Sequence, residues 1–223
     1  AVRHGGFIPW DDDIDIAMPL DDARRFAQIA PGELREGLTL QSPETEPTRE
    51  PIMKVRDNNS FYVEANDDFS MPYGKGLYVD IFPFIAYPNV SKGFCKKYGK
   101  GMSKCYSILH HSHTYSWRAA AELLWFGAKQ MWYSLRWKWA FATKRCDTFM
   151  SNVLINNGYG IMHRQDSIFP VGTISFEGKT FAAPCNPDAY LSDLYRNYMD
   201  IPPKEKQKVH AVFIMPELIE EEK

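Results

Sequence analysis

The sequence predicts an α+β fold, and three observations support this prediction. Segments of strand length, rich in β-branched and aromatic residues, are bounded by glycine, proline and asparagine. Other segments carry apolar residues at helical spacing, but the two kinds do not alternate in the strand–helix–strand rhythm of a parallel α/β protein. The composition, 44% hydrophobic and 24% charged among 223 residues, is that of an ordinary globular protein.

The N-terminal third is predicted to consist mainly of strands. A glycine turn introduces the first strand, residues 7–18, and Pro19 ends it. A helix is expected from about Asp21 until Pro31 stops it. Further strands are expected where apolar, β-branched runs recur, at residues 38–42, 52–57, 61–65 and 77–84. The second and third of these runs are expected to pair as a hairpin, because only three turn residues separate them.

The middle of the chain, residues 91–165, is predicted to be a helical insertion. Helical spacing extends over residues 91–157. Five of the six tryptophans lie in residues 117–141, where charges interrupt the apolar residues too often for a membrane-spanning helix. Tryptophan together with basic residues suits peripheral contact with a membrane interface. Two core-packed helices, with lysine and arginine stems reaching out to water, suit the pattern equally well.

Strand character returns after this insertion. A hairpin is expected over residues 173–181, around the turn at Glu177 and Gly178. Asn186 is expected to cap a last clear helix that has Pro187 at its first position.

Two other features are weighed against metal and nucleic-acid binding. The run CYSILHHSHTY brings four metal-ligating residue types together, but its spacing fits no standard structural zinc site, so a polar helix end is the preferred interpretation. These residues are Cys105, His110, His111 and His113. The four cysteines of the chain form no C-x-x-C motif and are expected to be reduced thiols. The formal net charge of −2 gives no general attraction to nucleic acid, and we expect no such partner.

The stretch GGFIPWDDDIDIAMP, residues 5–19, contains the main chemical signal. Side chains at i and i+2 of a strand share a face and lie roughly 6.5–7 Å apart, so Asp11, Asp13 and Asp15 are expected on one face. Ile14 and Ile16 are expected to enter the core from the other face, which turns Asp13 and Asp15 toward a cleft. Uncompensated carboxylates this close repel each other, and a divalent cation removes that cost. Hard oxygen ligands favour Mg²⁺ or Mn²⁺.

A third carboxylate, Asp80, lies alone in the apolar strand at residues 77–84. Phosphoryl and nucleotidyl transfer often use two metal ions about 3.5–4 Å apart, held by carboxylates from neighbouring strands. Asp13 and Asp15 would hold both ions, and Asp80 would hold the second ion and act as base toward an acceptor hydroxyl. Asp12 is expected to face away, and the role of Asp11 stays open.

Two alternatives remain for these aspartates. They could form an exposed acidic edge, with Asp80 in a salt bridge. A D-x-D motif also holds Mn²⁺ in glycosyltransferases that use nucleotide-sugars, and such an enzyme is the alternative function.

The N-terminal stretch AVRHGGFIPWDDDIDIAMP is more specific than a D-x-D motif and closely resembles the LicD family, whose phosphocholine transferases decorate bacterial surface glycans. The fukutin-related ribitol-phosphate transferases are more distant relatives. Further similar motifs follow in order along the chain: KVRD at residues 54–57, GLYVDIFPF at 76–84, FEGKTFAAPCNPDAYLSDLYRNYM at 176–199 and IPPKEKQKVH at 201–210.

The resemblance implies one nucleotidyltransferase-like domain over residues 1–223. It implies an Mg²⁺-dependent enzyme that transfers phosphocholine, or a similar phospho-alcohol, from a CDP-alcohol donor to a sugar hydroxyl, with release of CMP. The acceptor would be a glycan or lipid-linked glycan, such as a precursor of teichoic acid, lipopolysaccharide or capsule. Metal-binding aspartates of the family match Asp13 and Asp15, and the aspartate of its DIFP motif matches Asp80. Family members carry a GTLLGA run before VRH, of which Ala1 alone is present, so we expect the N-terminal part of the domain to be missing.

Four basic side chains are candidates for binding the donor. Arg3 and His4 directly precede the aspartate stretch, where they could meet a donor phosphate. Lys54 and Arg56 alternate on one predicted strand face and could neutralise the diphosphate, Lys54 as a point charge and Arg56 as a fork. Ordinary surface charge is the alternative for all four.

Tyr73 and Tyr78 could contact a quaternary ammonium group through cation–π attraction, although packing is the preferred interpretation for both.

We expect a cytoplasmic location, at the inner face of the membrane if the tryptophan-rich segment binds lipid. A non-catalytic scaffold at the membrane is the hypothesis from a different class.

Overall fold

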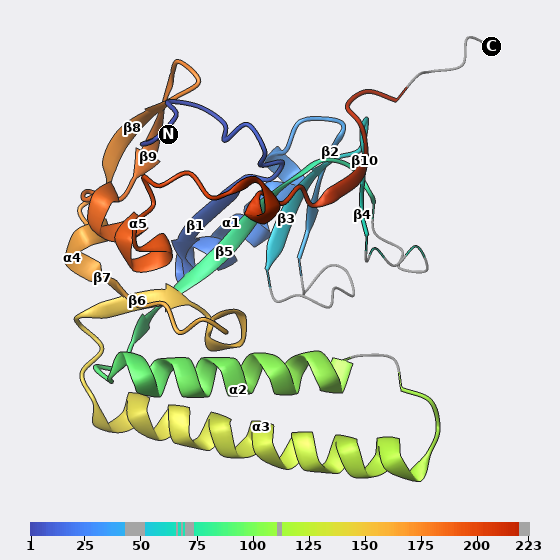
Figure 1. Cartoon of the computed structure of the whole chain (residues 1–223), viewed down its shortest axis with the longest axis vertical. Helices are drawn as coiled ribbons and strands as arrows, with labels where there is room; N and C mark the ends of the chain where they lie inside the picture. Colours follow the sequence, from blue (N-terminus) through green and yellow to red (C-terminus); the bar gives the residue numbers. More distant parts are fainter. Residues whose placement is uncertain (43–51, 66, 68, 70–73, 111–112, 219–223) are drawn as a thin grey trace. The chain divides into compact units, whose positions relative to one another are not determined.

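The computed structural model describes residues 1–42, 52–65, 67, 69, 74–110 and 113–218 (Figure 1). The chain divides into two compact units. We call the first the helical unit, Ala1–Gly6 and Phe84–Asp200, and the second the aspartate unit, Phe7–Pro83 and Ile201–Lys223. Helices and antiparallel strand pairs occur together in the described chain, which confirms the predicted α+β class.

The aspartate unit is built around antiparallel strands. Strand β3 lies between β2 and β5, β1 pairs with β5, and β4 pairs with β10. The elements are β1 (Asp15–Pro19), α1 (Leu20–Glu33), β2 (Leu38–Gln41), β3 (Met53–Asp57), β4 (Phe61–Glu64), the first part of β5 (Tyr78–Tyr87), the short 3₁₀ helix η2 (Lys204–Lys206) and β10 (Ala211–Met215).

The core of this unit forms where α1 packs against the sheet. Helix α1 places Ala23 and Ala30 on one face, seven residues apart, and both side chains are buried. They pack with Leu40, Met53 and Ile81, which come from β2, β3 and β5. Three separate strands are thereby fixed by one helix, and β5 carries Asp80 into this arrangement.

The first strand is much shorter than expected. A strand was predicted over residues 7–18, but β1 begins only at Asp15. The reason is Pro9, which has no N–H for a strand ladder and stands inside a turn that Asp11 closes by donating its backbone N–H to the Ile8 carbonyl at 3.0 Å. Asp11, Asp12 and Asp13 therefore lie on the segment between this turn and the strand.

Two further expectations for this unit were wrong. The runs at residues 52–57 and 61–65 do form strands, but they do not pair with each other. Instead β3 pairs with β2 and β5, and β4 pairs with β10 from the C-terminal part of the chain. Ile14 and Ile16, expected in the core, are 37% and 42% exposed, because the start of β1 is accessible to solvent.

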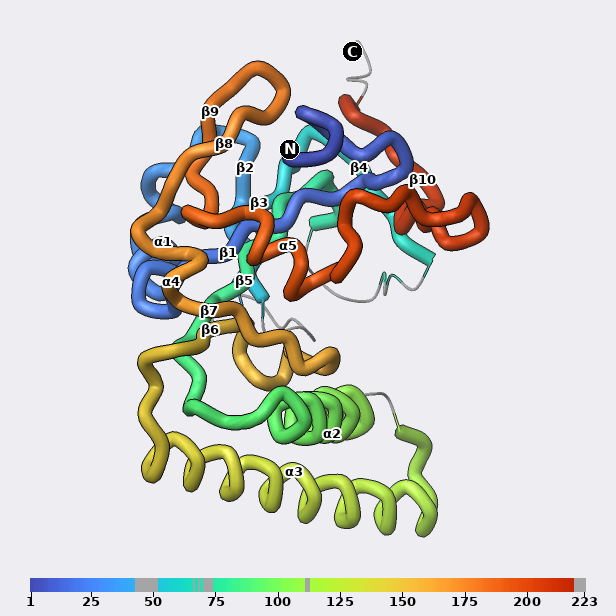
Figure 2. Tube along the Cα trace, turned by 60° about the vertical axis from the view of Figure 1, so that its left-hand side comes forward, coloured from blue at the N-terminus to red at the C-terminus, as the bar shows by residue number. Residues whose placement is uncertain are grey.

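The helical unit contains a long helical hairpin and further short elements (Figures 1 and 2). The second part of β5 pairs with β6, β6 pairs with β7, and β8 pairs with β9, all antiparallel. The elements are α2 (Lys92–His110), α3 (Trp117–Thr143), β6 (Phe149–Asn152), η1 (Leu154–Asn156), β7 (His163–Arg164), α4 (Gln165–Ile168), β8 (Gly172–Phe176), β9 (Lys179–Ala183) and α5 (Pro187–Tyr195).

The long helices in the middle of the chain end earlier than predicted. Helical structure was expected up to residue 157, but α3 ends at Thr143 and β6 follows. The reason is tertiary, because β6 is held by its register with β5, where Tyr87 lies opposite Phe149. A core that includes Tyr87, Tyr98 and Trp137 joins β5, α2 and α3.

Two local predictions for this unit are confirmed. The turn between β8 and β9 has Glu177 and Gly178 at φ values of 49° and 71°, the positive values that a tight hairpin turn needs. Helix α5 begins at Pro187, and the side chain of Asn186 accepts a hydrogen bond from the backbone N–H of Ala189.

In the described part of the chain, no helix has both the length and the hydropathy needed to cross a membrane.

Candidate active site

The aspartate unit brings the predicted carboxylates into one electrostatic neighbourhood from two parts of the chain. Asp13, Asp15 and Asp80 do not, however, form a group of three ligands within 4.8 Å of one another among the described residues. Asp13 precedes β1, Asp15 begins it, and Asp80 lies on the neighbouring strand β5. The backbone N–H of Asp80 donates to the Ile14 carbonyl at 2.9 Å. This hydrogen bond fixes Asp80 beside the residue that separates Asp13 from Asp15.

The electrostatics of Asp15 show that these carboxylates share one neighbourhood. Partial burial first, and then repulsion from Asp13 and Asp80, raises the pKa of the Asp15 carboxyl to about 6, while Lys54 opposes the shift. The pKa of Asp11 is also raised, by burial first and then by repulsion from Asp13, with whose side chain it shares a hydrogen bond. The cluster concentrates negative charge, which is the environment that a hard divalent cation stabilises.

Lys54 supplies a positive charge inside this cluster. In the register of β3 with β5, Lys54 lies opposite Asp80, and its Nζ atom is 2.6 Å from Asp80 Oδ1. The two side chains are only 14% and 12% exposed, so this ion pair is largely shielded from water. Asp80 is therefore in a salt bridge, as the alternative interpretation of the sequence expected. The same contact places Lys54, a predicted donor-binding residue, beside Asp80, a predicted metal ligand.

Arg56 shares a strand face with Lys54 but has partners within the protein. Its Nε donates to Gln41 Oε1 at 2.5 Å, and one terminal nitrogen donates to the Gly76 carbonyl at 3.1 Å. The guanidinium carbon lies 4.8 Å from the centre of the Tyr78 ring, and Lys54 Nζ lies 3.8 Å from the centre of the same ring. Arg56 is buried, so these contacts brace the strands that carry Lys54 and Asp80.

These contacts also bear on the two tyrosines considered for choline. The ring of Tyr78 already contacts two protein cations, and its hydroxyl donates to Glu64. Packing is therefore the role that the structure gives to Tyr78. Tyr73 lies outside the described residues.

The structure gives Asp12 partners that the sequence did not reveal. Its carboxylate accepts hydrogen bonds from the backbone N–H groups of His210 at 3.1 Å and Ala211 at 2.7 Å, and from the Tyr62 hydroxyl at 3.2 Å. Burial opposes ionisation of Asp12, but these hydrogen bonds outweigh it and hold the pKa below its ordinary value. Asp12 thus fastens the aspartate segment to the start of β10.

His210 is the residue of this site that sequence reasoning left without a role. Its Nδ1 atom lies 3.3 Å from Asp12 Oδ1 and 3.7 Å from Asp13 Oδ2. Among the described residues, Asp11, Asp12 and His210 form a group whose potential ligand atoms lie within 4.8 Å of one another. The signal that could have found His210 is its place at the end of the LicD-like segment 201–210.

Arg3 and His4 belong to the helical unit, and their described contacts lie within it. One guanidinium nitrogen of Arg3 donates to the Tyr198 carbonyl at 2.7 Å and to the Asp200 carbonyl at 3.0 Å. Arg3 Nε also donates to His4 Nδ1 at 3.2 Å. These contacts tie residues 1–6 to the end of the helical unit, and donor binding by Arg3 and His4 stays a prediction.

The zinc interpretation of the CYSILHHSHTY run gains no support. Cys105 is buried in α2. His110 Nδ1 lies 2.9 Å from the Tyr106 carbonyl and His113 Nε2 lies 2.7 Å from the Ile108 carbonyl, so each ring contacts its own chain segment. His111 lies outside the described residues. Within the described chain, these side chains form no metal-ligating group of three.

Comparison with known proteins places the chain in a family. Residues 1–118, more than half of the chain, match the family model described as LicD/FKTN/FKRP, nucleotidyltransferase domain. The chain belongs to the LicD family. This family resemblance was predicted from motifs that extend from residues 1–19 to residues 201–210, and it is confirmed.

A curated relative of this LicD family chain is similar over most of its length. It is the lipopolysaccharide cholinephosphotransferase LicD of Haemophilus influenzae, 28% identical over 230 residues, which cover 95% of this chain and 83% of the relative. No solved structure matches this LicD family chain significantly.

Proposed function

We propose that this LicD family chain is a phosphotransferase that moves phosphocholine, or a similar phospho-alcohol, from a CDP-activated donor to a sugar hydroxyl of a cell-surface glycan. Two findings support the proposal: membership of the family and similarity to a lipopolysaccharide cholinephosphotransferase. The structural observation that carries it is the cluster of Asp13, Asp15 and Asp80 with Lys54 inside it.

The donor set of this cluster fits a divalent cation. Its oxygens come from carboxylates that raise one another's proton affinity, and hard oxygen ligands favour Mg²⁺ or Mn²⁺. Asp13, Asp15 and Asp80 would hold the cation. When bound, it would polarise the donor phosphate and stabilise the negative charge that develops there.

In the proposed reaction, the acceptor hydroxyl oxygen attacks the β-phosphorus of the donor in line. The new phosphorus–oxygen bond forms as the bridging bond to CMP breaks, and CMP leaves with the bridging oxygen. Asp80 accepts the proton of the acceptor hydroxyl. Lys54, 2.6 Å from Asp80, brings positive charge to the diphosphate, and Asp12 holds the aspartate segment in place through β10.

The proposal is tested by following nucleotide release with the full-length protein. It would be incubated with Mg²⁺, a glycan extract and either CDP-alcohols or nucleotide-sugars, and the products separated by chromatography. We expect CMP from a CDP-alcohol, and no CMP when Mg²⁺ is chelated. Release of a nucleoside diphosphate from a nucleotide-sugar, without CMP from any CDP-alcohol, would instead identify a glycosyltransferase.

Two substitutions connect the activity to the carboxylates. Asp15→Asn and Asp80→Asn each remove one negative charge with little change in shape, and we expect turnover to fall at least about a hundredfold, the scale of losing one group that stabilises the transition state. The matched control is Asp21→Asn, whose side chain is 93% exposed on α1 of the same unit. Full activity in both site variants would contradict the assignment.

A further inference from the structure

The outward side of α3 is apolar along its length. Its most exposed large side chains are spaced three, four and seven residues apart, which places them on one side of a helix. They are Trp117, Leu124, Trp125, Met131, Trp132, Leu135 and Trp139, each more than half exposed. We call this surface the α3 outer face. A surface helix of a globular protein normally turns such a stripe toward the core.

The inward side of α3 already has its partners. Trp137 and Ala140 are buried, and Trp137 packs edge-on against Tyr87 with ring centres 5.0 Å apart. Tyr133 packs edge-on against Tyr98 of α2, with centres 5.6 Å apart. Figures 1 and 2 show α2 lying against α3 on this inward side, and Figure 2 shows that the two helices cross at an angle. The helix therefore cannot bury its outer face by rotating without giving up this core.

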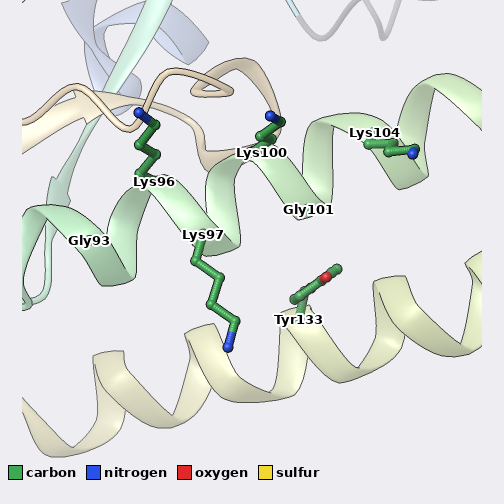
Figure 3. Close-up of a pocket in the computed structure, with 7 residues that line it drawn as sticks. All are labelled: Gly93, Lys96, Lys97, Lys100, Gly101, Lys104 and Tyr133. Carbon is green, nitrogen blue, oxygen red and sulfur yellow. The ribbon is translucent and has the colours of Figure 1, made fainter.

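The helical hairpin is also strongly basic. Helix α2 carries five lysines and α3 carries four basic residues, against one acidic residue, Glu122. The chain as a whole has a net charge of −2, so positive charge is concentrated on these two helices. Lys96, Lys97, Lys100 and Lys104 of α2 line a hollow of about 440 Å³ together with Tyr133 of α3. Figure 3 shows Lys97 and Tyr133 pointing into the space between the two helices, whereas Lys96 and Lys100 point away from α3. A surface of this kind attracts anions.

Arg136 joins the apolar stripe to this positive charge. Its guanidinium carbon lies 5.1 Å from the centre of the Trp139 ring and 5.9 Å from that of Trp132. Its Nε atom is buried and has no hydrogen-bond partner among the described residues. On the same helix, Lys129 Nζ lies 4.8 Å from the centre of the Trp125 ring. Cations are thus held beside exposed tryptophans on α3.

We propose that the α3 outer face docks on the surface of an anionic phospholipid bilayer. Tryptophan rings are stable at the level of the lipid headgroups, and basic residues beside them gain energy from anionic lipid phosphates. A second copy of this chain fits less well, because pairing two such faces would bring two sets of basic residues together. The α3 helix lies along the membrane plane, since its opposite side is packed on α2.

The experiment uses the whole chain and vesicles of defined composition. Binding is measured by co-sedimentation with vesicles of phosphatidylglycerol mixed with phosphatidylcholine, and with vesicles of phosphatidylcholine alone. We expect binding to the anionic vesicles that is at least about tenfold tighter and weakens as salt is added. Equal binding to both vesicles, or no binding to the anionic ones, overturns the proposal.

A pair of matched variants locates the surface. Trp132→Glu with Leu135→Glu places two charges on the outer face, and we expect binding to anionic vesicles to weaken at least about tenfold. The control, Tyr159→Glu with Val171→Glu, changes two exposed hydrophobic residues of the same unit away from α3 and should bind as the unchanged protein does. Circular dichroism checks that both variants fold.

Two further measurements keep the proposal falsifiable if the α3 variant does not fold. Brominated phosphatidylglycerol should quench the tryptophan fluorescence of the unchanged protein, because five of its six tryptophans lie on α3. Absence of quenching with bound vesicles overturns the placement of α3. Sedimentation without lipid tests the other occupant: a stable dimer that Trp132→Glu with Leu135→Glu dissociates would assign the outer face to a second copy.

Discussion

Replacing Asp12 by alanine should destabilise the aspartate unit. The substitution removes the acceptor for the Ala211 N–H at 2.7 Å, the His210 N–H at 3.1 Å and the Tyr62 hydroxyl at 3.2 Å. The Asp12 side chain is only 10% exposed, so water replaces these hydrogen bonds incompletely. Water can best replace the hydrogen bond from the backbone N–H of His210, because that residue is exposed.

The size of the effect follows from these contacts. A hydrogen bond to a charged group contributes about 1.5–3 kcal/mol, and a buried donor left without its partner costs about 1–3 kcal/mol. Because part of this loss is recovered from water at His210, we expect the free energy of unfolding to fall by about 2–3 kcal/mol. Asp12→Asn keeps one carbonyl oxygen as acceptor, so its loss should be about half as large.

The assay combines chemical denaturation with hydrogen exchange followed by mass spectrometry. Peptides covering β10 should lose protection in Asp12→Ala, because the Ala211 N–H loses its acceptor. Asp21→Ala is the matched control: its side chain is 93% exposed, so it should change the free energy of unfolding by less than about 0.5 kcal/mol. If Asp12→Ala matches this control in both measurements, the assignment of Asp12 as an anchor is refuted. Lost activity with unchanged stability would make Asp12 part of the reacting site.

Two further predictions concern buried charge. Lys54→Met removes the cation that is paired with the shielded Asp80 carboxylate and should lower the free energy of unfolding by about 3 kcal/mol. Urea denaturation should show that adding Asp80→Asn restores most of this loss without restoring transfer, and an additive double variant would count against the pair. Burial, opposed by Asp193, lowers the pKa of His163 to about 4, so unfolded chains bind more protons than folded ones between about pH 4 and 6.5. The contribution of His163 to stability should therefore be complete above about pH 6.5 and decline by up to about 3 kcal/mol as the pH falls toward 4. His163→Phe should reduce the acid-side slope in melting temperatures recorded from pH 7.5 to 4.5, and an unchanged slope would contradict it.

Local features of the fold could be predicted because their causes lie within a few residues. The hairpin turn at Glu177 and Gly178 and the cap at Asn186 were identified in this way. The shortened β1 was also decided locally, since Pro9 and the turn that Asp11 closes interrupt the expected strand. The closeness of Asp13 and Asp15 could also be predicted, because the two residues are only two positions apart in the sequence.

The partners of these elements depended on contacts between distant parts of the chain. Strand β4 pairs with β10, Asp12 binds His210 at a separation of 198 residues, and Lys54 meets Asp80 only through the register of β3 with β5. Alternating side chains show that a segment can be a strand, but every strand edge offers the same row of N–H and carbonyl groups. Which edges pair depends on which side chains can be buried together, as Ala23 of α1 and Ile81 of β5 are. That burial exists only once the chain has folded.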